Sequence, residues 1–220
     1  MSHPQHHDLF ENRKQFQLER MILFSDAVFA IAITLLIIEI KVPELHERET
    51  LLAAFERNET YSGFLGLALS FAIIGQFWTN HHKLFGYVNN FDNKLLWLNL
   101  HMLFWIILMP FSSALSSRHG GNDSVWMFYS FNLFMIGMSL YFLWRYITNP
   151  KHNLSFIADD PEIGKMATVR SLVVACIFLS GALLCLFGWK PTSWIARFVF
   201  LLIIPAMRVI SRRYSKKSLK

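Results

Sequence analysis

The sequence is poor in cysteine and in charge, and the shortage of cysteine excludes one class of protein. Charged residues make up only 16% of the 220 residues, and only two cysteines are present. Cys176 and Cys185 lie nine residues apart in one apolar run, so one helix carries both and they cannot bridge to each other. A scaffold held together by disulfides is therefore excluded.

Motifs of common catalytic centres are missing as well. Neither a Gly-x-Ser-x-Gly elbow nor a His-Glu-x-x-His zinc pair occurs, so we expect no enzyme. The first residues include His3, His6 and His7 among polar side chains, unlike a cleavable signal peptide with an apolar core. No low-complexity linker or convincing internal repeat divides the chain. The simplest organisation is a single domain over residues 1–220.

Apolar and aromatic residues are abundant instead. They make up 54% and 15% of the chain, with 21 Phe and 7 Trp. A soluble domain of this size has too little interior to bury so many rings, whereas lipid removes that limit. A spanning helix needs roughly 20 mainly apolar residues. Six such stretches run at about 21–40, 61–78, 95–115, 125–144, 169–189 and 194–210. The sequence thus predicts an all-α membrane protein, a single bundle of six transmembrane helices.

Positive charge lies mostly outside these stretches and predicts their orientation. The net charge is +6, and residues from Arg208 to Lys220 hold six Lys or Arg and no acid. On a membrane protein such a tail indicates topology and contact with anionic lipid, with nucleic-acid binding a weaker alternative. If the N-terminus is cytoplasmic, alternate loops place 15 Lys and Arg on that side and 5 on the other. We therefore expect a multi-pass protein of the cell membrane with both termini cytoplasmic.

The first outer loop, Val42 to Glu59, contains five glutamates, and the spacing of Leu51, Leu52 and Phe55 predicts a short surface helix. An acidic mouth would raise the local cation concentration. A solvated loop that was translocated because it lacks positive charge is an equally good interpretation.

The first apolar stretch contains a carboxylate, Asp26. A carboxylate near a helix centre costs about 2.5–3.5 kcal/mol on insertion scales, so Asp26 needs a partner. Arg20 reaches it only obliquely within one helix, which favours partners on neighbouring helices. At 100° per residue, Ile31, Leu35 and Ile38 share one stripe, and Asp26 lies about 140° from Ile31. We expect Asp26 to face its own bundle and the stripe to face lipid, the core or a symmetry axis.

Further polar side chains cluster at the depth of Ser25 and Asp26. They end the second stretch and begin the third: Asn80, His81, His82, Asn99 and His101. A buried hydrogen-bonded network is the favoured interpretation. A gating or proton-relay role and metal ligation by the adjacent histidines are alternatives, although two neighbours on a regular helix do not easily face one ion. We expect no metal.

Several motifs resemble one known family. Arg20-x-x-x-Phe24-Ser25-Asp26, the run from Ala27 to Leu36, Trp78-Thr79-Asn80-His81-His82 and Leu98-Asn99-Leu100-His101 are similar to the bacterial branch of the endosomal and lysosomal potassium channel family, transmembrane protein 175. The six-segment plan extends the resemblance over the whole chain.

The resemblance implies a potassium-preferring cation channel without a cofactor, in which four six-helix copies form a symmetric homotetramer around a central pore. Ile31, Leu35 and Ile38 would constrict the pore, and Arg20, Ser25 and Asp26 would hold the first helix in place. Some relatives carry threonine at the position of Ile38.

The chain lacks the Thr-Val-Gly-Tyr-Gly filter whose carbonyls replace the hydration shell of potassium. Four copies of Leu35 would instead form a hydrophobic constriction that gates by dewetting. Potassium loses water more readily than sodium, so a narrow apolar neck would prefer it modestly.

A proton-coupled secondary transporter is the main alternative, because an intramembrane acid with histidines can relay protons. Transporters commonly have helices broken by Gly or Pro and internal repeats. The first stretch has neither Gly nor Pro, and Pro110 and Pro205 are expected to kink or end later segments.

Overall fold

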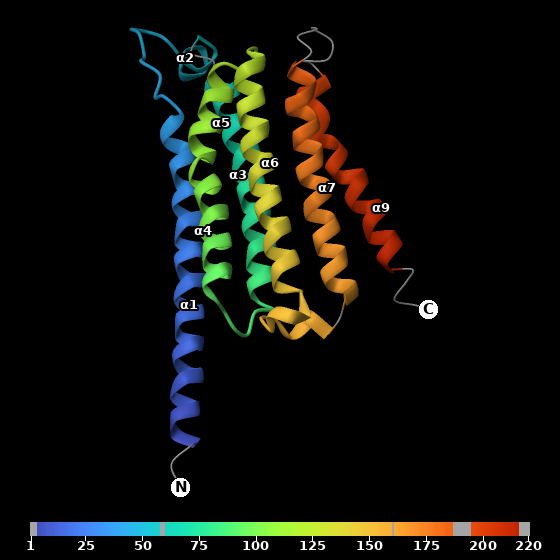
Figure 1. Cartoon of the computed structure of the whole chain (residues 1–220). Helices are drawn as coiled ribbons and strands as arrows, with labels where there is room; N and C mark the ends of the chain where they lie inside the picture. The colour runs from blue at the N-terminus through green and yellow to red at the C-terminus, as the bar shows by residue number, and fades with distance from the viewer. Residues whose placement is uncertain (1–3, 58–59, 160, 187–194, 216–220) are drawn as a thin grey trace.

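The computed structural model describes residues 4–57, 60–159, 161–186 and 195–215, and its regular structure there is helical apart from one bridge between Val88 and Ser155 (Figure 1). The all-α prediction agrees with this architecture. The α-helices are α1 (Pro4–Leu35), α2 (Leu51–Arg57), α3 (Thr60–Phe85), α4 (Asn93–Ile107), α5 (Met109–Arg118), α6 (Asp123–Ile147), α7 (Pro161–Leu186) and α9 (Ile203–Ser215). Four 3-10 turns join them: η1 (Leu36–Glu39), η2 (Pro150–His152), η3 (Phe156–Asp159) and η4 (Val199–Leu202).

Five spans of the described chain are long and apolar enough to cross a membrane. They are Arg13–Ile38, Thr60–Phe85, Asn93–Arg118, Asp123–Ile147 and Glu162–Leu186. These spans correspond to the first five predicted stretches. Residues 187–189 of the fifth stretch lie outside the described residues, as do Trp194 of the sixth and the lysines of the 216–220 tail.

The sixth predicted stretch is not one long helix over its described part. Residues 195–198 are helical, η4 follows them, and the 13 residues of α9 complete the described part of the segment. Arg197, which interrupts the stretch, donates from Nε to the Gly120 carbonyl at 2.8 Å and pairs with Asp123 at 3.3 Å. These bonds tie the start of the segment to the start of α6.

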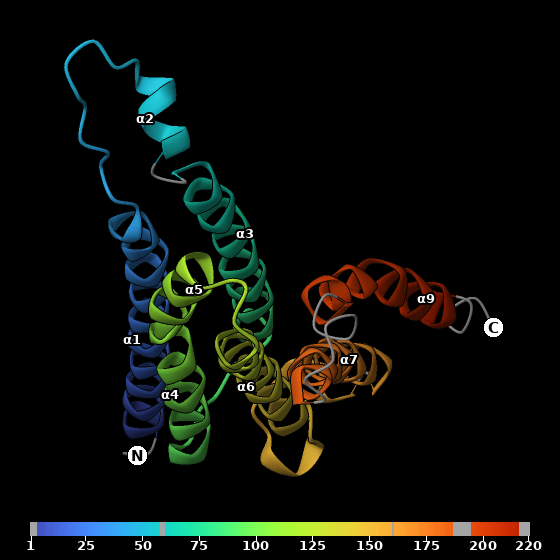
Figure 2. The same ribbon diagram turned by 90° about the horizontal axis from the view of Figure 1, so that it is seen from above.

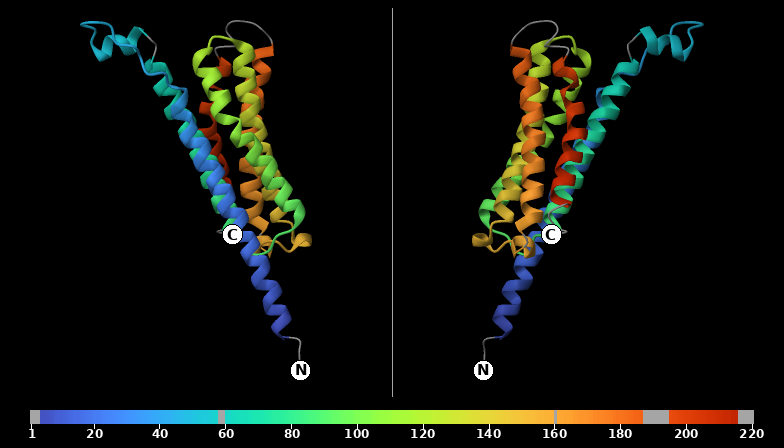
Figure 3. Two further views of the ribbon diagram at one scale, coloured as in Figure 1. Left: turned by 90° about the vertical axis from the view of Figure 1, so that its left-hand side faces the viewer. Right: turned by 90° about the vertical axis from the view of Figure 1, so that its right-hand side faces the viewer.

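The first helix begins well before the predicted residue 21. Residues 4–20 are mostly Gln, Glu, Arg, Lys and Leu, which favour helix without being apolar. Their turns project beyond the rest of the bundle (Figures 1 and 3). The apolar pattern therefore marked where lipid contact begins and not where the helix begins. At the other end, α1 tightens into η1.

The third apolar stretch is broken at Leu108, between α4 and α5. Pro110 lies in the first turn of α5, where its missing N–H and its ring prevent a continuous helix through Ile106. The predicted effect of this proline is confirmed. Asn132 donates to the Ser112 hydroxyl at 2.9 Å, so α5 is tied to α6 despite the break.

Viewed from above, α1, α4, α6 and α7 follow one another in a curved row, and α3 and α9 lie on one side of it (Figure 2). Helices α6 and α7 pack closely, and a Cβ added to Gly137 would lie 3.1 Å from Ala175. Small residues allow such close packing in membranes. Large apolar side chains also remain on the outside: Leu65 is 73% exposed and Trp97 is 70% exposed. That exterior suits lipid.

The two ends of the bundle differ. The N-terminus and the end of α9 lie toward one end, and the predicted surface helix, confirmed as α2, lies at the other (Figure 1). Lys83 lies in the last turn of α3 and Lys94 in the first turn of α4, at the end that carries the termini.

Candidate functional site

The outer face of α1 and η1 carries apolar side chains that do not pack inside the protomer. Ile31, Leu35 and Ile38 are 58%, 39% and 70% exposed. On the opposite side, Phe29 and Leu36 are almost completely buried. Three residues make one turn of 3-10 helix, so Ile38 lies close to the line of Leu35. The stripe is therefore not part of the protomer core, and it faces lipid or further copies of the chain.

The inner face of α1 is bound to its neighbours through Ser25, which is fully buried. Asn99 of α4 is also fully buried and donates from Nδ2 to the Ser25 hydroxyl at 2.8 Å. Its Oδ1 lies 2.8 Å from Nε2 of His81 on α3. One amide thus connects three helices.

These bonds form a chain with a single direction. The Ser25 hydroxyl donates to the Met21 carbonyl at 2.8 Å, so its oxygen accepts from Asn99. The Asn99 oxygen is then left to accept from His81, which places the imidazole proton on Nε2. Aligned hydrogen bonds polarise one another in a low dielectric. The chain fixes α1 against α3 and α4.

Asp26 has a separate partner. Its Oδ1 accepts a hydrogen bond from the indole Nε1 of Trp78 on α3 at 2.9 Å. The Trp78 ring lies against the ring of His82, with centroids 5.4 Å apart. Asp26 therefore points toward its own protomer, on the side opposite to the exposed stripe.

Replacing Trp78 with phenylalanine should destabilise the protein by about 1 kcal/mol, because the ring remains but the carboxylate of Asp26 loses its donor. Thermal unfolding in detergent measures the effect. Trp97→Phe is the matched control, since Trp97 is 70% exposed. Equal melting temperatures for the two variants would contradict the assigned role of the indole N–H.

The other predicted network residues lie elsewhere. The exposed guanidinium of Arg20 lies over the Phe16 ring, 5.8 Å from its centroid. Asn80 faces a cavity between α3, α6, α7 and α9. His101 lies 2.9 Å from the Ser139 hydroxyl of α6 and accepts from Trp105 at 3.2 Å. The polar residues therefore form separate contacts and not one continuous network.

The adjacent histidines diverge, as expected for neighbours on a helix. His81 is buried toward Asn99, whereas His82 is exposed against Trp78. Within the described ranges, no group of three or more His, Cys, Asp or Glu side chains is placed to hold a metal ion.

Sequence reasoning missed two partners, Trp78 and Ser139. Trp78 is part of the quoted motif that contains His81, but it was assigned no role of its own. The available signal was the indole N–H of Trp78, because a carboxylate inside the membrane, such as Asp26, needs a hydrogen-bond donor. Ser139 gave no such signal, because a serine in a helix can bond to a carbonyl of its own helix and then needs no partner elsewhere. In the structure the Ser139 hydroxyl donates to the Met135 carbonyl at 2.7 Å.

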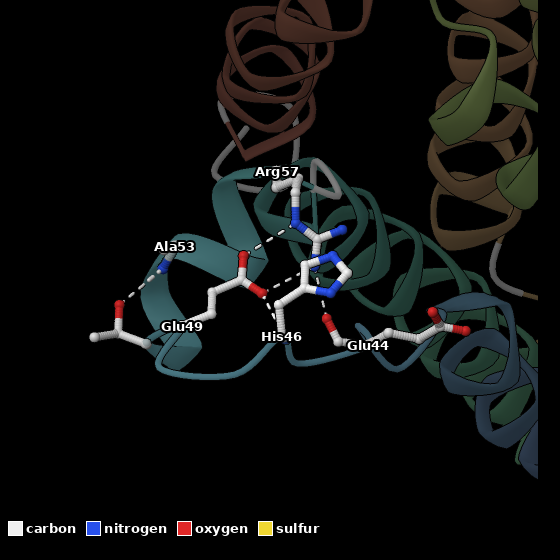
Figure 4. Close-up of polar contacts among 6 residues, drawn as sticks. Glu44, His46, Glu49, Ala53 and Arg57 are labelled. Carbon is white, nitrogen blue, oxygen red and sulfur yellow. Dashed lines mark hydrogen bonds and ion pairs between the residues drawn. The ribbon is translucent and has the colours of Figure 1, made fainter.

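The loop before α2 is organised around Glu49 (Figure 4). The Arg57 side chain donates to both carboxylate oxygens of Glu49, at 3.0 and 3.1 Å, and to the Glu44 carbonyl at 2.6 Å. The His46 amide also donates to Glu49, at 3.0 Å. At least one of the five glutamates of the predicted acidic mouth is thus neutralised by an arginine of the same loop.

The Glu49 contacts make the loop resistant to acid. The hydrogen bonds from Arg57 and then from the His46 amide lower the pKa of Glu49 from 4.5 to about 2. Because the pKa is lowered, the Glu49 contacts stabilise the loop fully above pH 4.5, and this stabilisation is lost as the pH falls through about 2. A carboxyl NMR titration in micelles should give a midpoint near 2 that rises in Arg57→Gln. A midpoint near 4.5 in the unmodified protein would contradict the ion pair.

Comparison with known proteins gives consistent matches. Residues 20–110 match the family model described as endosomal/lysosomal potassium channel TMEM175. A protein of Streptomyces collinus named a potassium channel is 35% identical over 146 residues, which are 64% of this chain and 70% of the relative. A Chryseobacterium protein, also named a potassium channel, is 42% identical over 94 residues. That match spans 43% of this chain and only 46% of the relative.

The fold is shared with solved structures. The crystal structure of a lysosomal potassium-selective channel TMEM175 homolog from Chamaesiphon minutus is similar with a TM-score of 0.70 at 26% identity. The similarity covers 90% of this chain and 98% of that one.

Proposed function

Because the chain belongs to the endosomal/lysosomal potassium channel TMEM175 family, we propose that it is a potassium-preferring cation channel that conducts passively. The names of its relatives and the similarity of its fold to a potassium-selective homologue support the proposal. The observation that carries it for this chain is the exposed stripe of α1.

The proposed assembly is a homotetramer of six-segment protomers in the cell membrane, with η4 and α9 contributing the sixth segment. Each α1 turns Ile31, Leu35 and Ile38 toward the symmetry axis. The 58%, 39% and 70% exposure of these side chains in one protomer leaves them free for this contact. Both termini are cytoplasmic in this arrangement, as the Lys and Arg count favours.

Four Leu35 side chains form the narrowest apolar ring in the proposed pore. Such a ring excludes water when narrow and admits a partly dehydrated ion when it widens. Potassium gives up water at a lower cost than sodium, so the ring prefers it. Ile38 adds a second apolar layer where some relatives have hydroxyl groups.

The inner face of α1 supports this pore mechanically. The Ser25–Asn99–His81 chain and the Asp26–Trp78 bond hold the helix against α3 and α4, so the stripe keeps its direction. Proton-coupled transport would need a connected relay. The hydrogen bonds of Asp26 and His81 lead instead to different partners, which favours the channel.

Reconstituted protein tests the proposed function. In liposomes with a potassium gradient, currents should reverse near the Nernst potential of potassium, and clamping the proton gradient should leave the flux unchanged. Flux that stops when the proton gradient is clamped would overturn the channel in favour of a coupled transporter.

A further inference from the structure

A cavity of about 640 Å³ lies between α3, α6, α7 and α9, and no residue of α1 lines it. Figure 2 shows α3 and α9 on the same side of α6 and α7, which form its floor. None of the residues proposed for the pore lines it. The cavity therefore needs an explanation of its own.

Its polar lining has one sign of charge. Lys83, Arg170 and Arg208 line the cavity, and no Asp or Glu of the described residues does. The uncharged polar residues include Gln76 and Asn80. Three cations without an acid in one partly apolar cavity repel one another unless an anion joins them.

Arg170 is poised to bind an anion. One Nη2 hydrogen bond goes to the Ser211 hydroxyl of α9 at 2.8 Å. Its Nε is buried and has no hydrogen-bond partner among the described residues. A buried donor without an acceptor costs free energy, and a ligand oxygen would remove that cost.

The remaining walls are apolar. They are formed by side chains of α3, α6, α7 and α9, among them Phe77, Leu140, Trp144, Val174, Ile203 and Met207. A free inorganic anion gains nothing from apolar walls, whereas acyl chains are buried favourably against them. The cavity thus combines a cationic end with an apolar slot.

The cations also lie on three different helices. Lys83 lies near the end of α3, Arg170 in the first half of α7 and Arg208 in the middle of α9. The end of α3, the start of α7 and the end of α9 all lie toward the end of the bundle that carries the termini (Figure 1). In the proposed topology this is the cytoplasmic leaflet, whose anionic lipids attract Lys and Arg.

We propose that this cavity binds one anionic phospholipid of the cytoplasmic leaflet. Lys83, Arg170 and Arg208 hold its phosphate, and its acyl chains lie between α7 and α9. A zwitterionic lipid binds less tightly because its own ammonium group repels the three cations.

Binding to the purified full-length protein in detergent tests the site without any measurement of conduction, so its outcome is independent of the proposed channel function. The probes are dioctanoyl-phosphatidylglycerol, dioctanoyl-phosphatidylcholine and inorganic phosphate, with lipid occupancy measured by native mass spectrometry. We expect phosphatidylglycerol to bind more tightly than phosphatidylcholine, and equimolar phosphate to leave it in place.

Lys83→Gln and Arg208→Gln should each weaken phosphatidylglycerol binding about fivefold, the effect of one lost cation near a lipid phosphate. Arg145→Gln is the matched control, because Arg145 is exposed on α6 and donates to Tyr141 outside the cavity. Melting temperatures verify that each variant is folded. If one of the two cavity variants does not fold, the other one is enough for the test.

Three results would overturn the proposal. Equal affinity for the two lipids would show an acyl-chain slot without headgroup recognition. Displacement of the lipid by phosphate would show a simple anion site. Equal affinities of folded Lys83→Gln, Arg208→Gln and Arg145→Gln would place the lipid elsewhere.

Discussion

Replacing Leu35 with alanine is expected to raise the unitary conductance several-fold and to weaken the preference for potassium over sodium. The leucine is 39% exposed in the protomer, so its loss leaves the protomer core intact. In four copies the change widens the proposed neck and lets water and hydrated ions enter. Single-channel recording in lipid bilayers measures the conductance, and the reversal potential with potassium on one side and sodium on the other measures the preference.

Leu183→Ala is the matched control for Leu35→Ala. Leu183 is 47% exposed on α7, which lies away from α1 (Figure 2). The same leucine-to-alanine change there should alter neither quantity. If Leu35→Ala conducts as the unmodified protein does, the pore lies outside the α1 stripe.

Replacing Asn99 with alanine should lower the stability by about 1–3 kcal/mol, the cost of leaving buried polar partners unsatisfied. The change removes the donor to Ser25 and the acceptor for His81 in one step. A cavity adds to the loss because Asn99 is fully buried. Thermal unfolding of the purified protein measures it.

Asn89→Ala supplies the comparison, since Asn89 is exposed between α3 and α4. Combining Asn99→Ala with Ser25→Ala should cost less than the sum of the single changes, because both remove one shared bond. A melting temperature for Asn99→Ala equal to that of Asn89→Ala would show that the chain of hydrogen bonds contributes nothing.

The orientation of α1 could be predicted from the sequence. A period of 3.6 residues placed Asp26 opposite Ile31, and the structure has Asp26 bonded to α3 while Ile31 is 58% exposed. The break near Pro110 followed from the chemistry of proline. Both features depend on local geometry, which a single chain segment specifies.

The partners of the polar residues could not be predicted in the same way. The contact of His101 with Ser139 depends on how α4 and α6 are rotated against each other, and packing of distant segments sets that rotation. The helix over residues 4–20 was not predicted, for another reason. Apolarity reports the membrane, whereas the helix of residues 4–20 follows from backbone propensity.

The most direct test of the α1-lined pore is cadmium block of Leu35→Cys in a protein with Cys176 and Cys185 replaced by alanine. Thiolates from neighbouring copies around a narrow axis bind this soft ion together. We expect micromolar cadmium to stop potassium flux through Leu35→Cys and to leave Leu183→Cys in the same background unaffected. Unchanged flux through Leu35→Cys in the presence of cadmium would contradict a pore lined by α1.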